Sequence, residues 1–176
     1  MTTFTPLIHH RLALCLFALL TAAPLTGYCT SDLSPLPELP PAELGALSLK
    51  ASAVQQGTLN ISHITQRGAA ETASVQQTGN SNRAALTQTG AANTATTTQQ
   101  GSNNDIQLVQ TGSNNMAEVT QQGSGNRVRL EQFTSSAYAR VDQLGNFNQA
   151  TVQQTIPGAL PPIIQIGTGL MLNVYR

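Results

Sequence analysis

Glutamine recurs every eleven residues through most of this 176-residue chain, and this period limits the possible folds more than any other feature. Eleven glutamines follow one another at this spacing without a gap: Gln55, Gln66, Gln77, Gln88, Gln99, Gln110, Gln121, Gln132, Gln143, Gln154 and Gln165. Nine of them are followed two residues later by a glycine: Gly57, Gly68, Gly79, Gly90, Gly101, Gly112, Gly123, Gly145 and Gly167. A fixed short period is typical of repeat proteins, in which each unit packs only against its neighbours.

Each repeat unit also carries a polar and an apolar pattern with a period of two. Three residues after the glycine position, seven units have asparagine: Asn60, Asn82, Asn93, Asn104, Asn115, Asn126 and Asn148. Alanine usually follows two residues later, and valine, leucine or isoleucine two residues after that. Because side chains alternate along a strand, the asparagine, alanine, branched and glutamine positions share one face. The glycine that follows accommodates a left-handed backbone, so it predicts a turn after each strand.

Two such units form the smallest arrangement that can bury this shared face. We therefore predict an all-β fold, a β-solenoid with two strands in each 22-residue coil and amyloid-like stacking of the coils. Coils about 4.8 Å apart would place glutamine directly over glutamine, so that each amide donates to one neighbour and accepts from the other. Such bonds satisfy inward polar groups that would otherwise cost about 1–3 kcal/mol each.

Composition supports this thin core and disfavours several functions. Only 9% of residues are charged, 4% are aromatic and none is tryptophan, so an ordinary globular core has little to build on. The formal net charge is zero, which disfavours nucleic acid as a partner. The eight acidic residues are scattered, and no calcium-binding repeat is present. We predict no catalytic, cofactor-binding or metal site, and we expect that the chain is not an enzyme.

The chain divides into four segments. Residues 1–27 read as a signal peptide, with a weakly basic start at His9 to Arg11 and an apolar stretch over 12–20 that is too short to span a bilayer. Residues 28–47 form a proline-rich leader, either an extended linker or an address for a secretion apparatus. Residues 48–155 hold the regular repeats, and residues 156–176 form a divergent last repeat. Lipidation of Cys29 is a weaker alternative, because Tyr28 interrupts the lipoprotein box.

The order Gln-x-Gly-x-x-Asn-x-Ala-x-x-x-Gln resembles the curlin repeat of bacterial curli fibres. The resemblance extends over about residues 48–176, with good matches from Gln77 to Ala84 and from Gln88 to Ala95. It implies a functional amyloid outside a Gram-negative cell, a cell-surface fimbrium that builds biofilm matrix and mediates adhesion. The partners it implies are a further copy of the chain, a homologous curlin subunit, the curli-type secretion machinery and the outer-membrane surface.

The last repeat is similar to that of the minor, nucleating subunit of this family, and Arg176 stands where a twelfth glutamine would fall. The candidate anchor to the cell comprises Leu170, Met171, Leu172, Val174, Tyr175 and Arg176. Pro157, Pro161 and Pro162 and the long leader depart from the family pattern. A major curlin subunit and a monomeric solenoid adhesin remain alternatives, and an enzyme built on a β-helix is the least favoured.

Overall fold

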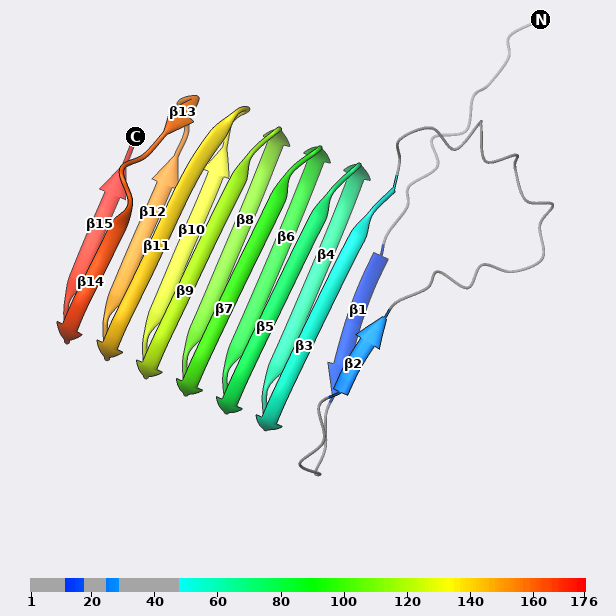
Figure 1. The fold of residues 1–176 in the computed structure, drawn as a ribbon. Helices are drawn as coiled ribbons and strands as arrows, with labels where there is room; N and C mark the ends of the chain where they lie inside the picture. The colour runs from blue at the N-terminus through cyan, green and yellow to red at the C-terminus, as the bar shows by residue number, and fades with distance from the viewer. Residues whose placement is uncertain (1–11, 18–24, 29–47) are drawn as a thin grey trace, which may run out of the picture.

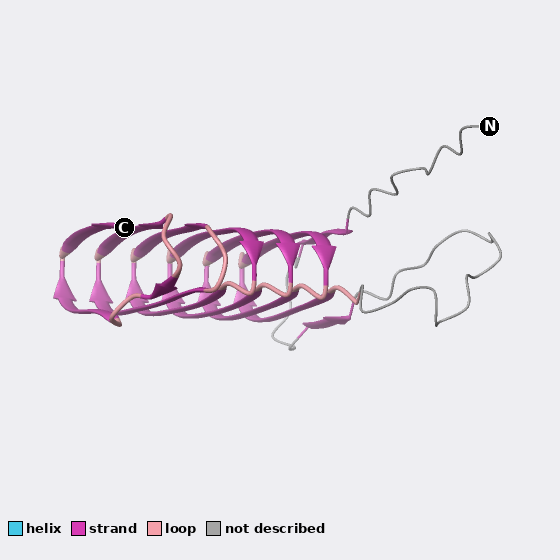
Figure 2. Ribbon diagram, turned by 90° about the horizontal axis from the view of Figure 1, so that it is seen from above, coloured by secondary structure: helices cyan, strands magenta, loops and turns pink. Residues whose placement is uncertain are grey.

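A computed structural model describes residues 12–17, 25–28 and 48–176. Over residues 48–176 the chain winds into a two-layered β-solenoid of about six coils, each with one strand in either layer (Figures 1 and 2). The predicted fold class is thereby confirmed. Much of the predicted signal peptide and nearly all of the proline-rich leader lie outside the described residues.

Strands of alternate repeat units belong to alternate sheets. One sheet has the order β1-β4-β6-β8-β10-β12-β15, and the other has the order β13-β11-β9-β7-β5-β3-β2, with β14 also paired to β11. The strands are β1 (Leu12–Phe17), β2 (Leu25–Tyr28), β3 (Lys50–Thr58), β4 (Ile61–Ala69), β5 (Thr72–Asn80), β6 (Arg83–Ala91), β7 (Thr94–Ser102), β8 (Asp105–Ser113), β9 (Met116–Ser124), β10 (Arg127–Phe133), β11 (Ala137–Asn146), β12 (Gln149–Gln154), β13 (Gly158–Ala159), β14 (Ile163–Thr168) and β15 (Met171–Tyr175). From β3 to β12 every pair within a sheet is parallel and offset by 22 residues, as in Gln88 beside Gln110.

The core is the narrow space between the two sheets. In β6 the inner residues Ala84, Leu86 and Gln88 are fully buried, whereas Arg83 on the outer face is exposed. The same alternation recurs along the stack, so alanine and branched residues form a continuous apolar strip beside the amide side chains. Thr97 stands in the branched position of its unit and is also buried.

The glycine two residues after most of the ladder glutamines is required by the close approach of successive coils. A Cβ atom on Gly101 would lie 2.0 Å from the carbonyl oxygen of Gly123, and Gly101 has a φ of +119°. A turn was predicted at the glycine position, but each turn also contains a second left-handed residue two positions after the glycine, which was not predicted. That residue is seldom glycine: Leu59, Ala70, Ser81, Ala92, Asn103, Asn114, Ser136 and Phe147 all have φ between 56° and 57°. Non-glycine residues rarely adopt this conformation, so the stacking of the turns must hold it in place.

The divergent last repeat joins the stack with one irregularity. β13 pairs with β11 at an offset of 21 residues, whereas β14 pairs with the same strand at an offset of 22. One extra residue therefore sits between β13 and β14, as in a β-bulge. This shift buries Leu160 and leaves Pro161 and Pro162 exposed, so Leu160 takes the inner place that the repeat assigns to Pro161.

The first coil of the solenoid is bordered by two antiparallel strands. β1 pairs with β4 and β2 pairs with β3, and both β1 and β2 belong to the part of the chain predicted to be a signal peptide, apart from Tyr28. Every pair formed among the solenoid strands themselves is parallel. The first coil can therefore accept further strands along its edge.

Candidate assembly surface

Two ladders of glutamine amides run the length of the solenoid, one in each sheet. All eleven predicted glutamines are buried, none being more than 4% exposed. Gln88 Nε2 donates to Gln110 Oε1 at 2.8 Å and to the Thr72 carbonyl oxygen at 3.0 Å. The Gln88–Gln110 contact recurs from coil to coil with distances of 2.6–3.2 Å. The inward polar groups are thus paired along the stacking direction.

The asparagines form a second set of ladders at the turns. Asn82 Oδ1 accepts from the backbone N–H of Asn104 at 3.2 Å and from its Nδ2 at 3.0 Å. Asn82 Nδ2 in turn donates to the Gly101 carbonyl oxygen at 2.9 Å. All seven predicted asparagines are buried, and each donates to a carbonyl oxygen nineteen residues further along the chain. These contacts join each turn to the next coil.

Glu71 replaces asparagine in this ladder, and the sequence analysis did not single it out. Its side chain is fully buried and accepts from the Asn93 backbone N–H at 2.9 Å and from Asn93 Nδ2 at 3.1 Å. An asparagine at this position would donate to the carbonyl oxygen of Gly90, nineteen residues later. An ionised carboxylate has no proton to donate to that oxygen. Burial raises the pKa of Glu71 above its ordinary value, although its bonds from Asn93 act in the opposite direction. The signal was available, because Glu71 occupies an asparagine position of the repeat.

The glutamine ladders have a direction that makes the two ends of the stack different. In every inter-coil bond Nε2 of the earlier residue donates to Oε1 of the later one, as from Gln55 to Gln77. The first coil is therefore left with acceptors. Among the described side chains, Gln55 Oε1, Gln66 Oε1 and Ser62 Oγ are buried without a hydrogen bond. Each such group costs about 1–3 kcal/mol unless a partner is supplied.

The last coil presents apolar side chains instead. Of the candidate anchor residues, Val174 is half-buried, and Leu170, Met171, Leu172, Tyr175 and Arg176 are exposed. On the outer face of β14, Ile164 and Ile166 are 60% and 72% exposed, whereas outer positions of the other coils are mostly polar. Arg176 Nη1 donates to the Ala159 carbonyl oxygen at 2.9 Å, so it closes the last coil rather than extending the ladder.

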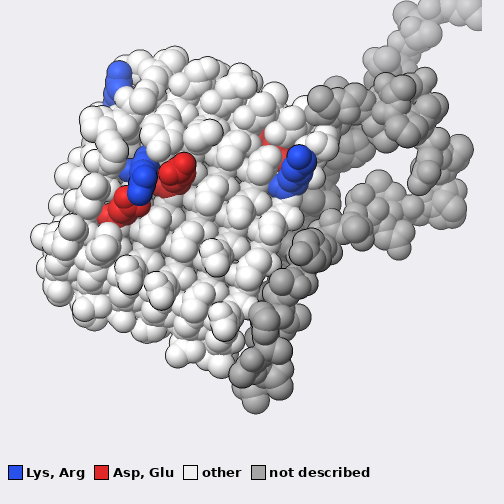
Figure 3. Space-filling view, viewed as in Figure 1, with Lys and Arg blue, Asp and Glu red and all other residues white. Residues whose placement is uncertain are grey.

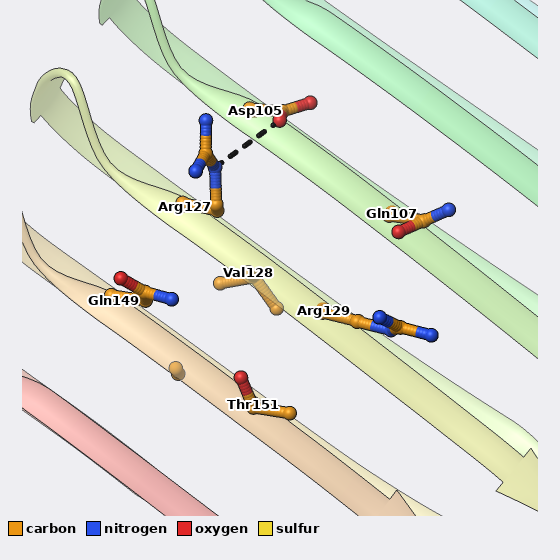
Figure 4. A pocket seen from close by; sticks show the side chains of 8 residues that line it. Asp105, Gln107, Arg127, Val128, Arg129, Gln149 and Thr151 are labelled. Atoms are coloured by element: carbon orange, nitrogen blue, oxygen red, sulfur yellow. Dashed lines mark ion pairs between the residues drawn. The ribbon is translucent and has the colours of Figure 1, made fainter.

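Charged side chains are few on the face of the molecule drawn in Figure 3, which is mostly uncharged. Arg127 pairs with Asp105 of the preceding coil at 3.4 Å, and both residues line a pocket of about 350 Å³ (Figure 4). Arg140 lies in register with Glu118 but pairs with Asp142 of its own strand at 2.9 Å. Residues two apart on a strand face the same side, so an in-strand partner competes with one 22 residues away.

No sign of a metal centre or a membrane-crossing helix is found in the part of the chain that the structure describes. Within it, no three His, Cys, Asp or Glu side chains come together to hold a metal ion. No helix there is long and apolar enough to cross a bilayer.

Comparison with known proteins yields one family. The Curlin associated repeat matches residues 63–90, 79–112, 90–123, 101–133 and 112–145, five overlapping stretches within the regular coils. Successive matches mostly begin eleven residues apart, which is the period of the glutamine ladder. No curated protein and no solved structure matches the chain. These repeat matches support the predicted resemblance of the chain to the curlin family.

Proposed function

We propose, from the curlin-associated repeats that residues 63–145 carry, that this chain is a structural subunit of extracellular curli-type amyloid fibres. The supporting observation is the stack of buried amide ladders with unpaired acceptors in its first coil. Soluble β-proteins usually blunt or cover such edges, because an open edge pairs with another chain. An open rung of identical, in-register side chains is instead suited to cross-β assembly.

Within such a fibre, the nucleator and anchor of a homologous major subunit is the role we favour. The regular coils offer a template that another curlin-repeat chain can continue. The last coil differs from them, because it carries exposed apolar residues and Arg176 in place of a ladder glutamine. The candidate anchor would then hold the fibre at the outer-membrane surface, after export by curli-type secretion machinery. The fibre would serve biofilm matrix and cell adhesion.

Assembly is tested first with the chain from residue 28 onward, purified under denaturing conditions and diluted into buffer. We expect dye-binding fibres with a meridional reflection near 4.7–4.8 Å, the spacing of stacked strands. Trace amounts should also abolish the lag phase of a major curlin subunit. A chain that remains monomeric at high concentration, gives no such reflection and leaves that lag unchanged would rule out a fibre subunit.

The anchoring role is tested in cells. Deleting residues 156–176 should leave fibre formation intact but release fibres into the medium, because the apolar last coil is lost. The deletion removes β13, β14 and β15 and leaves β3 to β12 complete. Fibres that stay on the cell surface after this deletion would argue for a major subunit or another anchor.

A further inference from the structure

We propose that this stack is extended mainly at its first coil, which receives the last coil of another curlin-repeat chain, and that its own last coil is a poor surface for a further copy. The proposal rests on the proposed fibre function and names the surface and the partner for it. The partner is defined by chemistry: its last coil must carry glutamine and asparagine at the ladder positions.

The first coil is a complete receiving surface. Its inner residues follow the repeat pattern, with Ala53 and Gln55 on β3 and Ile64 and Gln66 on β4 all buried. The two glutamine oxygens lack donors, whereas the corresponding amide nitrogens already donate to Gln77 and Gln88. A coil placed before this one in register would bring two glutamine Nε2 groups to these oxygens. The direction of the ladder thus sets the direction of growth.

Two antiparallel strands border the first coil in this structure. β2 places Leu25 opposite Gln55, and β1 places Leu12 opposite Gln66. The backbone edge of the first coil is thus covered, while Gln55 Oε1 and Gln66 Oε1 have no hydrogen bond. Cleavage after Gly27, as the sequence predicts, would remove β1 and all of β2 except Tyr28. The receiving surface would then become available only after export.

The chain's own last coil is a poor match for this surface. Continuing the 22-residue register from one copy into the next puts Leu170 over Asn60, Leu172 over Ser62 and Arg176 over Gln66. Leu170 offers no side-chain oxygen to the backbone N–H of Asn60, although a ladder asparagine accepts the equivalent bond throughout the regular coils. Arg176 replaces the glutamine whose amide would donate to Gln66 Oε1, and its guanidinium already donates to the Ala159 carbonyl oxygen.

The other sheet reinforces this mismatch. There the last coil is split into β13 and β14, with Pro161 and Pro162 in the gap. Proline has no backbone N–H, and a bulge distorts the edge, which are two of the ways by which natural sheets avoid further pairing. A second copy is therefore a worse partner for the first coil than a curlin-repeat chain with a regular last coil.

The test compares the chain from residue 28 onward with a variant whose last coil has been made regular, Leu170→Asn, Leu172→Ala and Arg176→Gln. We expect the regularised chain to assemble by itself at least about tenfold faster, because each copy can now dock on the first coil of the next. Adding Gln55→Leu and Gln66→Leu to it should abolish that gain. Gln56→Leu with Gln76→Leu, two exposed glutamines, is the matched control and should preserve the gain.

A second measurement tests the direction of growth and needs only the regularised variant. Seeds of the unaltered chain in one colour are supplied with regularised chain in another colour and imaged by fluorescence microscopy. New material should be present at one end of each seed. Growth at both ends, or equal assembly rates of the unaltered and regularised chains, would overturn the proposal. If neither chain forms fibres or shortens the lag of a major subunit, the proposed function itself fails.

Discussion

Two coils of the stack, one formed by β9 and β10 and the other by β14 and β15, follow the same 22-residue spacing. They differ in the hydrogen-bonding side chains that they present to a neighbouring coil. In the first, Gln121 and Gln132 accept from the coil before and donate to the coil after. In the second, Gln165 keeps this place on β14, but the equivalent residue on the other sheet is Arg176. The period alone thus places a strand in the stack, whereas the residue in each column decides whether another coil can follow.

The glycine column gives the sharpest way to separate the two regions. Gly101→Ala should prevent stacking, because its Cβ would lie 2.0 Å from the Gly123 carbonyl oxygen, in addition to a strained φ. Gly167→Ala carries a similar φ of +139°, but its Cβ would approach nothing closer than Leu170 Cδ1 at 3.5 Å. Backbone strain costs about 1–3 kcal/mol in both variants, and overpacking adds about 1–3 kcal/mol at Gly101 alone. Denaturant unfolding of the chain from residue 28 onward measures the difference, and equal losses would contradict the close-approach explanation.

The inner ladder should matter more than the outer face of the same strand. Gln110→Ala breaks the bonds with Gln88 and Gln132 and leaves buried amide groups unpaired, at a cost of about 2–4 kcal/mol. Gln107→Ala changes an exposed side chain on β8 and should change stability by less than about 0.5 kcal/mol. Assembly kinetics of the two variants should differ in the same order. If Gln107→Ala slowed assembly as much as Gln110→Ala, the assignment of the faces would be wrong.

Glu71 should make the early coils sensitive to pH, unlike the asparagine positions elsewhere. Because burial raises the pKa of Glu71 in the folded chain, folding favours its protonated form. The contribution of Glu71 to the stability of the fold is therefore greatest at a pH below its ordinary pKa of 4.5. This contribution falls as pH rises through the higher pKa of Glu71 in the folded chain. The charged residues of the strands around it, Lys50, Arg67 and Arg83, are all exposed, as is His63. β5 and β7 contribute no titratable side chain.

Glu71→Asn should remove this pH dependence and stabilise the chain at pH 7 by about 1–2 kcal/mol, because the new amide can donate to Gly90. Urea unfolding at pH 4 and pH 7 measures both effects. Glu118→Gln, on the outer face of β9, serves as the control for removing one carboxylate from the chain. A Glu71→Asn profile that still varies like that of the unaltered chain would show that another group titrates.

The outer ion pairs should have the smallest effect of all. The side chains of Arg127 and Asp105 are 65% and 39% exposed, and water screens their attraction. Arg127→Ala should therefore cost less than about 1 kcal/mol, and the loss should shrink further in 1 M salt. Denaturant unfolding at low and high salt measures this. A loss as large as that of Gln110→Ala would mean that surface charge, not the amide ladder, sets the register.

The repeat could be read from the sequence because every coil contains the same residues at the same positions. Glutamine and asparagine positions spaced by eleven define the strands, the faces and the 22-residue offset, as Gln88 beside Gln110 illustrates. The bulge that buries Leu160 could not be read in this way, because the prolines mark an interruption without saying which neighbour turns inward. Left-handed residues such as Leu59 and Ala70 were also missed, since leucine and alanine have no preference for that conformation.

Glu71 and the outer ion pairs show a different limit. Glu71 was visible as an exception in the asparagine column, but only the structure shows that its carboxylate is buried against Asn93. Arg140 has two acidic neighbours, Glu118 on the adjacent strand and Asp142 on its own strand. The sequence alone does not show which of them forms the ion pair. Repetition thus predicts what all coils share, while single departures from it depend on local geometry.

The most direct test is solid-state NMR of fibres assembled from the chain from residue 28 onward with ¹⁵N, ¹³C-labelled glutamine. If like amides bond from coil to coil, side-chain Nε2 nitrogens will show strong transfer to the Cδ carbon of a second glutamine, and Gln110→Ala will weaken that signal. Side chains that transfer only within their own residue, with Nε2 protons exchanging freely with water, would contradict the ladder and the assembly mechanism built on it.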